Sequence, residues 1–298
     1  MKNNKSDNNY SNDYLFYEIL VRIFTALHVA DLAKASMVCK AWNVASRAPV
    51  LWKTLDLNEL GMDVPLRLYA WFGEHSSKKM TQILKYASSL GGENISCLIF
   101  NYYVYLTDEH LISIAERTPN LKRVVLPITG NISKIGIEIA MRSWGGIESI
   151  TVTEMFNNAN FLNAVGKYCK NIVSLKFTCL FEQYHAEAIV NYTPNLRTLS
   201  IRHFLVSMRG LCHVLNSLEH LEVVNLCHCL ITDLLEGSFQ DYSIEDLRER
   251  VDFSCELIIC KENSCLRCTN RLRNDRGRPS YENMEDIWRE DEIESLAH

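Results

Sequence analysis

The sequence predicts an α/β protein in which a short helical unit precedes a solenoid of strand–helix repeats. The first observation is the pattern L-x-x-L-x-L, which recurs six times between residues 95 and 226, with 24 to 26 residues between successive first positions. A period in this range is typical of solenoids whose repeats each supply one strand and one helix. The second observation is that the apolar residues between positions 15 and 46 have helical spacing. We therefore expect a helical module joined to a horseshoe of repeats.

The helical module begins after a polar segment. Residues 1–13 are rich in Asn and poor in apolar residues, so we expect them to be disordered. Three helices are predicted next, the second capped by Asp31 and the third passing through Val38, before Pro49 ends the helical segment. The first helix has an apolar face that contains Ile19, Leu20, Ile23, Phe24 and Leu27. The module is assigned to residues 14–58.

Each repeat is expected to place a strand at the L-x-x-L-x-L pattern and a helix after it. An irregular first repeat is assigned to residues 59–94, the regular repeats to 95–240, and a terminal capping unit to 241–270. Residues 271–298 are expected to form a solvated tail, since positions 282–294 hold seven acidic residues and one basic residue. The strand positions are Ile95/Leu98/Phe100, Leu121/Val124/Leu126, Ile147/Ile150/Val152, Ile172/Leu175/Phe177, Leu196/Leu199/Ile201 and Leu221/Val224/Leu226.

Composition argues against several classes of protein. A net charge of −5 and a pI near 6.0 disfavour a nucleic-acid binder, which normally presents a basic surface. The polar first residues lack the apolar stretch of a secretory signal, and no apolar run is long enough to cross a bilayer. We expect a protein of the nucleus, the cytoplasm or both, with no membrane partner. Its eleven cysteines are interpreted as reduced thiols.

The histidines and cysteines could form a metal or catalytic centre instead of being ordinary side chains. Structural zinc sites use four thiolates, and four cysteines cluster near the C-terminus, but only the last two have the usual C-x-x-C spacing. Free thiols are favoured over zinc, so no metal and no cofactor are assigned. No protease, hydrolase or phosphate-loop motif is present either, and His110, His185 and His213 are interpreted as surface or partly satisfied side chains. The four cysteines are Cys255, Cys260, Cys265 and Cys268.

The helical module resembles the F-box. The resemblance rests on the sequences Leu15-Phe-Tyr-Glu-Ile-Leu20, Asp31-Leu32, Ser36-Met-Val-Cys-Lys-Ala-Trp42 and Pro49-Val-Leu-Trp52. Followed by leucine-rich repeats, it is similar to the F-box/LRR-repeat family, and the junction that follows Leu51 is similar to plant members. One departure is Phe16, where the family usually has Pro after Leu. Since Pro is favoured at helix starts, we expect a looser start of the first helix and weaker adaptor binding.

The resemblance implies a non-catalytic subunit of an SCF-type ubiquitin ligase. In this family the F-box binds a Skp-type adaptor, which holds the cullin and RING subunits, and the repeats select the protein to be ubiquitinated. The alternative is a repeat-protein scaffold that has no ligase partner, and an enzyme with a cysteine or zinc centre is a third class. The adaptor is expected to contact an apolar surface formed by Leu15, Phe16, Ile19, Leu20, Ile23, Val38, Cys39 and Trp42, although some of these residues must instead hold the three helices together.

Substrate binding is predicted on the concave face of the strands. Because side chains alternate along a strand, the residues between the core positions face away from the helices. Hydroxyl groups there can hold an extended segment, and cations can pair with acidic or phosphorylated groups. Loops or the irregular region before residue 95 are the alternative binding site. The predicted ladder contains Arg123, Val125, Ser149, Thr151, Ser174, Lys176, Thr198, Ser200, Arg202 and Asn225, with Cys97, Ile99, Asn101, Thr153, Thr178 and Val223 in equivalent places.

Overall fold

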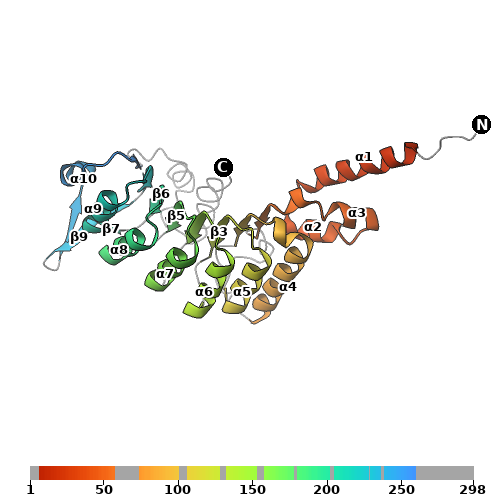
Figure 1. Ribbon diagram of the computed structural model, residues 1–298, viewed down its shortest axis with the longest axis horizontal. Helices are drawn as coiled ribbons and strands as arrows, with labels where there is room; N and C mark the ends of the chain where they lie inside the picture. Colours follow the sequence, from red (N-terminus) through yellow and green to blue (C-terminus); the bar gives the residue numbers. More distant parts are fainter. Residues whose placement is uncertain are drawn as a thin grey trace, which may run out of the picture.

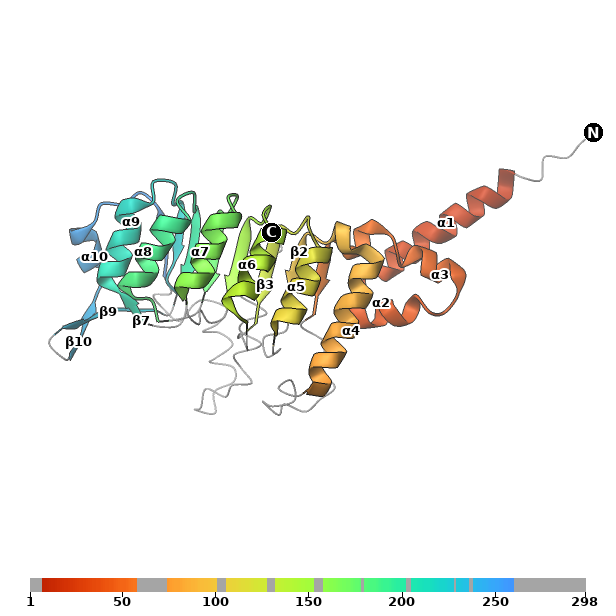
Figure 2. The same cartoon turned by 60° about the horizontal axis from the view of Figure 1, so that its bottom comes forward.

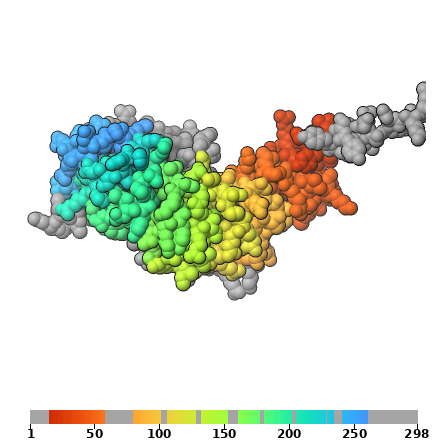
Figure 3. Space-filling view, viewed as in Figure 1, coloured from red at the N-terminus to blue at the C-terminus, as the bar shows by residue number. Residues whose placement is uncertain are grey.

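A computed structural model of the chain has an elongated shape (Figures 1 and 3), with a helical unit at one end of a long parallel sheet (Figure 1). This arrangement confirms the predicted fold class. The structure describes residues 7–57, 74–100, 106–127, 132–152, 158–177, 180–201, 205–227, 229–235 and 238–259.

The N-terminal unit consists of three helices and a short 3₁₀ turn. The first helix starts at Asp7, inside the segment that the sequence predicted to be disordered. A helix that is already nucleated extends at low free-energy cost, which explains the extra turns. The elements are α1 (Asp7–Phe24), α2 (Val29–Ala35), α3 (Lys40–Ala45) and η1 (Pro49–Trp52).

One parallel sheet runs through the described part of the repeats. Its strand order is β1-β2-β3-β4-β5-β6-β8-β11, and every adjacent pair is parallel. The strands follow the chain order with one repeat per step, as expected for a solenoid. They are β1 (Thr54–Asp56), β2 (Cys97–Ile99), β3 (Arg123–Leu126), β4 (Ser149–Val152), β5 (Ser174–Phe177), β6 (Thr198–Ile201), β8 (Val223–Asn225) and β11 (Glu256–Ile258).

Helices α4 to α9 line one face of this sheet (Figures 1 and 2). Each neighbouring pair of these helices is in contact, so the helices stack in the same order as the strands. They are α4 (Glu74–Gly91), α5 (Asp108–Arg117), α6 (Lys134–Ser143), α7 (Asn158–Tyr168), α8 (Gln183–Tyr192) and α9 (Met208–Ser217), with the 3₁₀ turn η2 (Gly92–Asn94) after α4 and the short helix α10 (Ile244–Arg250) after α9.

The repeated leucine pattern forms the core between the sheet and the helices. At the central position of the pattern, the residues are paired in register from strand to strand, and all six are fully buried. The first positions are buried as well, so the predicted core is confirmed there. The central positions are Leu98, Val124, Ile150, Leu175, Leu199 and Val224.

A second, three-stranded sheet lies near the C-terminal end of the stack and was not predicted. It consists of β7 (Leu205–Ser207), β9 (Leu230–Leu235) and β10 (Ser238–Tyr242), in the order β10-β9-β7. The β9–β10 pair is antiparallel, and it follows the last regular repeat. The sequence signal is weak because these strands mix polar and apolar residues without regular alternation. Among the described residues, no helix combines the length and apolar character needed to cross a bilayer.

Candidate partner-binding surfaces

Helix α1 has an apolar face that packs into the N-terminal unit. Leu20 and Phe24 are buried there, and the Phe24 ring contacts Trp42 edge-on, with 5.4 Å between the ring centroids. Tyr17 and Val21 are partly buried against the same core. The spacing i, i+3, i+4 and i+7 of these α1 residues places them on one side of the helix.

A second apolar stripe on α1 faces solvent. Ile19 is 48% exposed and Ile23 is 53% exposed, and Leu15 and Phe16 are more than half exposed as well. Residues i, i+4 and i+8 lie on one side of a helix, so the four side chains form a continuous stripe. Exposed apolar side chains that are concentrated in this way mark a surface that a partner covers.

More large apolar side chains are exposed elsewhere in the N-terminal unit. Met37 and Val38, which lie between α2 and α3, are 74% and 63% exposed. Val44 on α3 and Val50 in η1 are each more than half exposed. Because α2 and α3 have only 7 and 6 residues, the unit lacks the volume to bury these side chains itself. We call these four residues and the outward stripe of α1 the outer apolar surface.

The predicted adaptor residues divide into two groups. Leu15, Phe16, Ile19, Ile23, Val38 and Cys39 are exposed, whereas Leu20 is buried in the core and Trp42 is half-buried against Phe24. Leu20 and Trp42 are therefore the members of the set that hold the helices of the unit together, as expected for some of these residues. Adaptor contact by the exposed members stays a prediction. Three exposed residues, Met37, Val44 and Val50, were missed. The only sequence feature that could have indicated them is a large apolar side chain in a short helical segment.

Phe16 lies inside α1 and not at its start. The helix continues for nine residues before this position, so the expected looser helix start is not found. A proline there would lack the backbone N–H and would clash with the preceding turn. The Phe16 side chain instead adds apolar area to the outer apolar surface, with 51% of it exposed.

The N-terminal unit packs firmly on the first repeat. The Trp52 indole is buried and donates a hydrogen bond of 2.7 Å from Nε1 to the Ser46 carbonyl. Helix α4 ends directly against it, because a Cβ at Gly91 would lie only 2.8 Å from Trp52 Cδ1. The Tyr86 hydroxyl on α4 also hydrogen-bonds with the Ser36 hydroxyl. These contacts hold the two parts of the molecule in one orientation.

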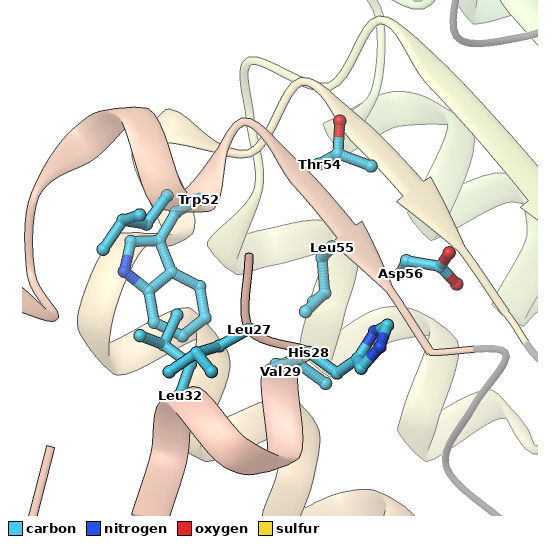
Figure 4. A pocket seen from close by; sticks show the side chains of 9 residues that line it. Leu27, His28, Val29, Leu32, Trp52, Thr54, Leu55 and Asp56 are labelled. Atoms are coloured by element: carbon cyan, nitrogen blue, oxygen red, sulfur yellow. The ribbon is translucent and has the colours of Figure 1, made fainter. Parts of the chain in front are cut away.

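A small cavity of about 100 Å³ lies at the same junction (Figure 4). Its wall is mostly apolar, with His28 and Asp56 on one side of it. The volume is sufficient for a few water molecules and much smaller than a pocket for an organic ligand. It therefore gives no indication of a small-molecule substrate.

The sheet face opposite the helices is the concave face. Two rows of side chains cross it, one residue from each strand, because paired strands are in register. Arg123 lies in the first row and Lys176 in the second, and both are half-buried. The first row is Cys97, Arg123, Ser149, Ser174, Thr198 and Val223, and the second row is Ile99, Val125, Thr151, Lys176, Ser200 and Asn225.

Six described positions of the predicted ladder are buried although they lie on the face away from the helices. They are Cys97, Ile99, Val125, Ser149, Thr151 and Ser200. Side chains on strands about 4.8 Å away shield these residues on two sides, which accounts for part of their burial. Ser174, Thr198 and Asn225 are half-buried, whereas Arg202 and three further ladder positions, Asn101, Thr153 and Thr178, lie outside the residues whose side chains are described.

Buried hydroxyls on this face lack hydrogen-bond partners. Within the described part of the chain, Ser149 Oγ, Thr151 Oγ1 and Ser200 Oγ are buried and have none. A buried hydroxyl without a partner costs on the order of 1 to 3 kcal/mol. Since nearly all buried polar groups in proteins are hydrogen-bonded, three such groups on one face are unusual.

The histidines and cysteines considered for a metal or catalytic site were located where the structure describes them. Of the expected surface or partly satisfied positions, His110 and His185 take the second kind: both are buried, and their Nδ1 atoms accept backbone hydrogen bonds at the start of α5 and α8. Burial lowers the pKa of His185 to about 4. Among the described residues, no cluster of His, Cys, Asp and Glu could hold a metal ion. Cys260, Cys265 and Cys268, considered for zinc, lie outside the described residues.

Comparison with known proteins finds relatives along nearly the whole chain. The F-box-like family matches residues 17–58. An F-box/LRR-repeat protein of Arabidopsis thaliana is 34% identical over 290 residues, which cover 94% of each chain. An F-box protein of the same plant is 27% identical over 321 residues, again 94% of each chain. F-box/LRR-repeat protein 22 from this plant is 24% identical over 229 residues, or 75% of this chain and 69% of that relative.

Proposed function

Because the chain belongs to the F-box/LRR-repeat family, we propose that it is the substrate-recognition subunit of an SCF-type ubiquitin ligase. Members of this family are typically non-catalytic subunits. In this proposal, the N-terminal unit binds a Skp-type adaptor, and through it the cullin and RING subunits, while the repeats bind the protein to be ubiquitinated. The observation that carries the proposal is the outer apolar surface of the N-terminal unit.

The outer apolar surface supports adaptor binding by its size and composition. Its apolar side chains are too large and too numerous to be explained as isolated exposed residues, which occur on every soluble protein. Apolar stripes on helices bind partners by burying one helix face in a groove. The matched family segment, residues 17–58, contains most of this surface, although Leu15 and Phe16 precede it.

The firm junction between the N-terminal unit and α4 supports a protein that binds the adaptor with one part and the substrate with the other. The buried Trp52 and the close approach of Gly91 leave little room for independent motion of the two parts. A protein bound to the repeats is then held in a defined position relative to the adaptor. Ubiquitin transfer benefits from this geometry because a reacting lysine must be presented at the right place.

The concave face supports recognition of an extended acidic or phosphorylated segment. On strands β2 to β8, the two rows of this face contain two cations, Arg123 and Lys176, and no carboxylate. Cations pair with acidic or phosphorylated groups through short, charge-assisted hydrogen bonds. The three unpartnered hydroxyls add donors and acceptors for a peptide backbone.

The direct test of adaptor binding is reconstitution with purified components. The full-length protein is mixed with a Skp-type adaptor from a plant, and the complex is measured by size-exclusion chromatography and calorimetry. A stable one-to-one complex that then recruits cullin supports the proposal. A protein that folds but binds no adaptor would contradict it and favour the alternative of a repeat-protein scaffold without a ligase.

Recognition by the concave face is tested separately. Substrates are identified by pull-down and mass spectrometry, and captured again by the triple variant Arg123→Ala, Lys176→Ala and Arg202→Ala. We expect selective loss of these substrates while adaptor binding is retained. Undiminished capture by a folded variant would move recognition to loops or to the region before residue 95.

A further inference from the structure

The centre of the concave face is more deeply buried than its own side chains explain. Val125 and Thr151 are both 0% exposed, and Ile99 and Ser200 are only 3% exposed. Side chains on neighbouring strands shield a short residue on two sides, but they leave it open in the direction away from the sheet. In the described part of the chain, helices α4 to α9 all lie on the opposite face (Figures 1 and 2). Neighbouring side chains on the sheet alone therefore do not account for this burial.

The pattern of exposure locates this unexplained burial. At the two ends of the sheet, Asp56 on β1 and Ile258 on β11 belong to the second row and are exposed. Burial is deepest between them, on β2 to β6. The unpartnered hydroxyls of Ser149, Thr151 and Ser200 fall in the same region. A segment that covers this region would cross the middle of the sheet and could offer polar groups to these hydroxyls.

The chain beyond the last strand has the length to reach this region. After β11 at the edge of the sheet, 39 residues remain, from 260 to 298. The distance from β11 to β3 is five strand spacings, or roughly 24 Å. About eight extended residues span that distance. Positions 282–294 lie 24 or more residues after β11, so they can reach any part of the concave face.

The charge and apolar content of residues 282–294 are complementary to the covered region. This acidic segment has seven carboxylates and one basic residue, and it also contains Met284, Ile287 and Trp288. The middle of the concave face presents the cations Arg123 and Lys176 beside apolar side chains such as that of Val125. Opposite charge and buried apolar area would both stabilise the contact.

We propose that the acidic segment 282–294 binds the concave face of its own chain. The segment occupies the surface over β2 to β6, with its carboxylates beside Arg123 and Lys176 and its apolar side chains against the middle of the second row. Under the proposed function, the segment competes with the substrate. This consequence alone rests on the proposed function. A substrate must then displace it, and only segments that bind more tightly than the tail are captured.

Cys97 provides a probe of this cover. Its thiol belongs to the first row, is 8% exposed, and has a pKa raised by burial to about 11. Cys169 is a matched reference, because it is buried in the helix-side core and its pKa is raised to about 12. Alkylation of each cysteine is followed by mass spectrometry of its peptide. Removal of the cover should accelerate the reaction of Cys97 alone, because a thiolate must be both formed and accessible to react.

The test variant keeps the full chain and carries Glu285→Lys, Asp286→Lys and Trp288→Ala. We expect Cys97 to react about tenfold faster than in the wild type or more, with Cys169 unchanged. A rate for Cys97 equal to that of the wild type would overturn the proposal. Protection of Cys97 that disappears on dilution of the wild type would also overturn it, because the cover would then come from a second copy.

A control variant separates sequence-specific binding from a general change of charge. It carries Glu262→Lys, Asp275→Lys and Leu272→Ala, which change the net charge equally outside the acidic segment. We expect wild-type protection of Cys97 in this variant, and equal acceleration in both variants would contradict the assignment to 282–294. Carbodiimide coupling of the wild type should also join Lys176 to a carboxylate of the acidic segment. Absence of this cross-link would count against the contact even if a variant failed to fold.

These readouts do not depend on ligase function. Protection of Cys97 that is lost in the test variant, together with failure to bind any adaptor, would leave the intramolecular contact in place and remove only the proposed function. Conversely, a protein that binds adaptor but shows no protection of Cys97 by the acidic segment would retain the proposed function without this regulation.

Discussion

Two consecutive residues of α1 give the sharpest test of the outer apolar surface. Ile19 is 48% exposed, whereas Leu20 is 4% exposed and belongs to the core. Burying a whole isoleucine side chain stabilises by about 1.5 to 3 kcal/mol, so a partner that covers the exposed half of Ile19 gains about 1 kcal/mol. Ile19→Asp also forces a carboxylate into an apolar interface, at a cost of several kcal/mol. We expect adaptor affinity to fall about 100-fold or more.

In the free protein, the substitution of Leu20 should reduce stability much more than the substitution of Ile19. Ile19→Asp changes a surface position and should alter the free energy of unfolding by about 0.5 kcal/mol. Leu20→Ala removes a buried side chain and should cost about 2 to 5 kcal/mol, with adaptor affinity nearly unchanged while the protein is folded. Calorimetry of adaptor binding and thermal unfolding measure the two effects. Wild-type affinity in Ile19→Asp, or equal loss of stability in both variants, would refute the assignment of Ile19 to a partner-binding face of α1 and of Leu20 to the core.

Three further predictions concern stability, each measured by thermal or urea unfolding. Leu175→Ala empties a fully buried core position and should cost about 2 to 5 kcal/mol, so an unchanged melting temperature would remove it from the core. Gly91→Ala must push against Trp52 and should cost about 1 to 3 kcal/mol, whereas Gly146→Ala, which meets only a lysine ammonium at 3.8 Å, should be tolerated. His185 has its pKa lowered to about 4, so stability is lost as the pH falls from 6.5 towards 4, when the unfolded chain takes up a proton that the folded chain does not. Between pH 7 and 4.5 this amounts to about 2 kcal/mol, and His185→Gln should lose that part of the pH dependence.

The repeats could be predicted from the sequence because their pattern is local and repeated. A strand buried on one face must carry apolar residues at alternate positions, and each repeat meets the same requirement. Leu98, Ile150 and Leu199 therefore occupy equivalent places in the pattern and in the structure. The hairpin of β9 and β10 has no such repetition, and its strands are defined by pairing with each other and with β7.

The direction of each apolar side chain in the N-terminal unit required the tertiary structure. Ile19 and Leu20 are both apolar and adjacent, so periodicity alone does not distinguish the buried stripe from the exposed one. Contact with Trp42 and the other helices decides that Phe24 and Leu20 face inward.

The concave face divides in the same way between sequence and tertiary structure. Alternation along each strand, read from the sequence, determined that Val125 and Thr151 point away from the helices. Only the assembled sheet reveals that both are fully buried, because burial depends on segments far apart along the chain that meet over one surface. Local spacing thus determined the repeats and the side of each strand, whereas long-range contacts decided which apolar and hydroxyl groups remain open to a partner.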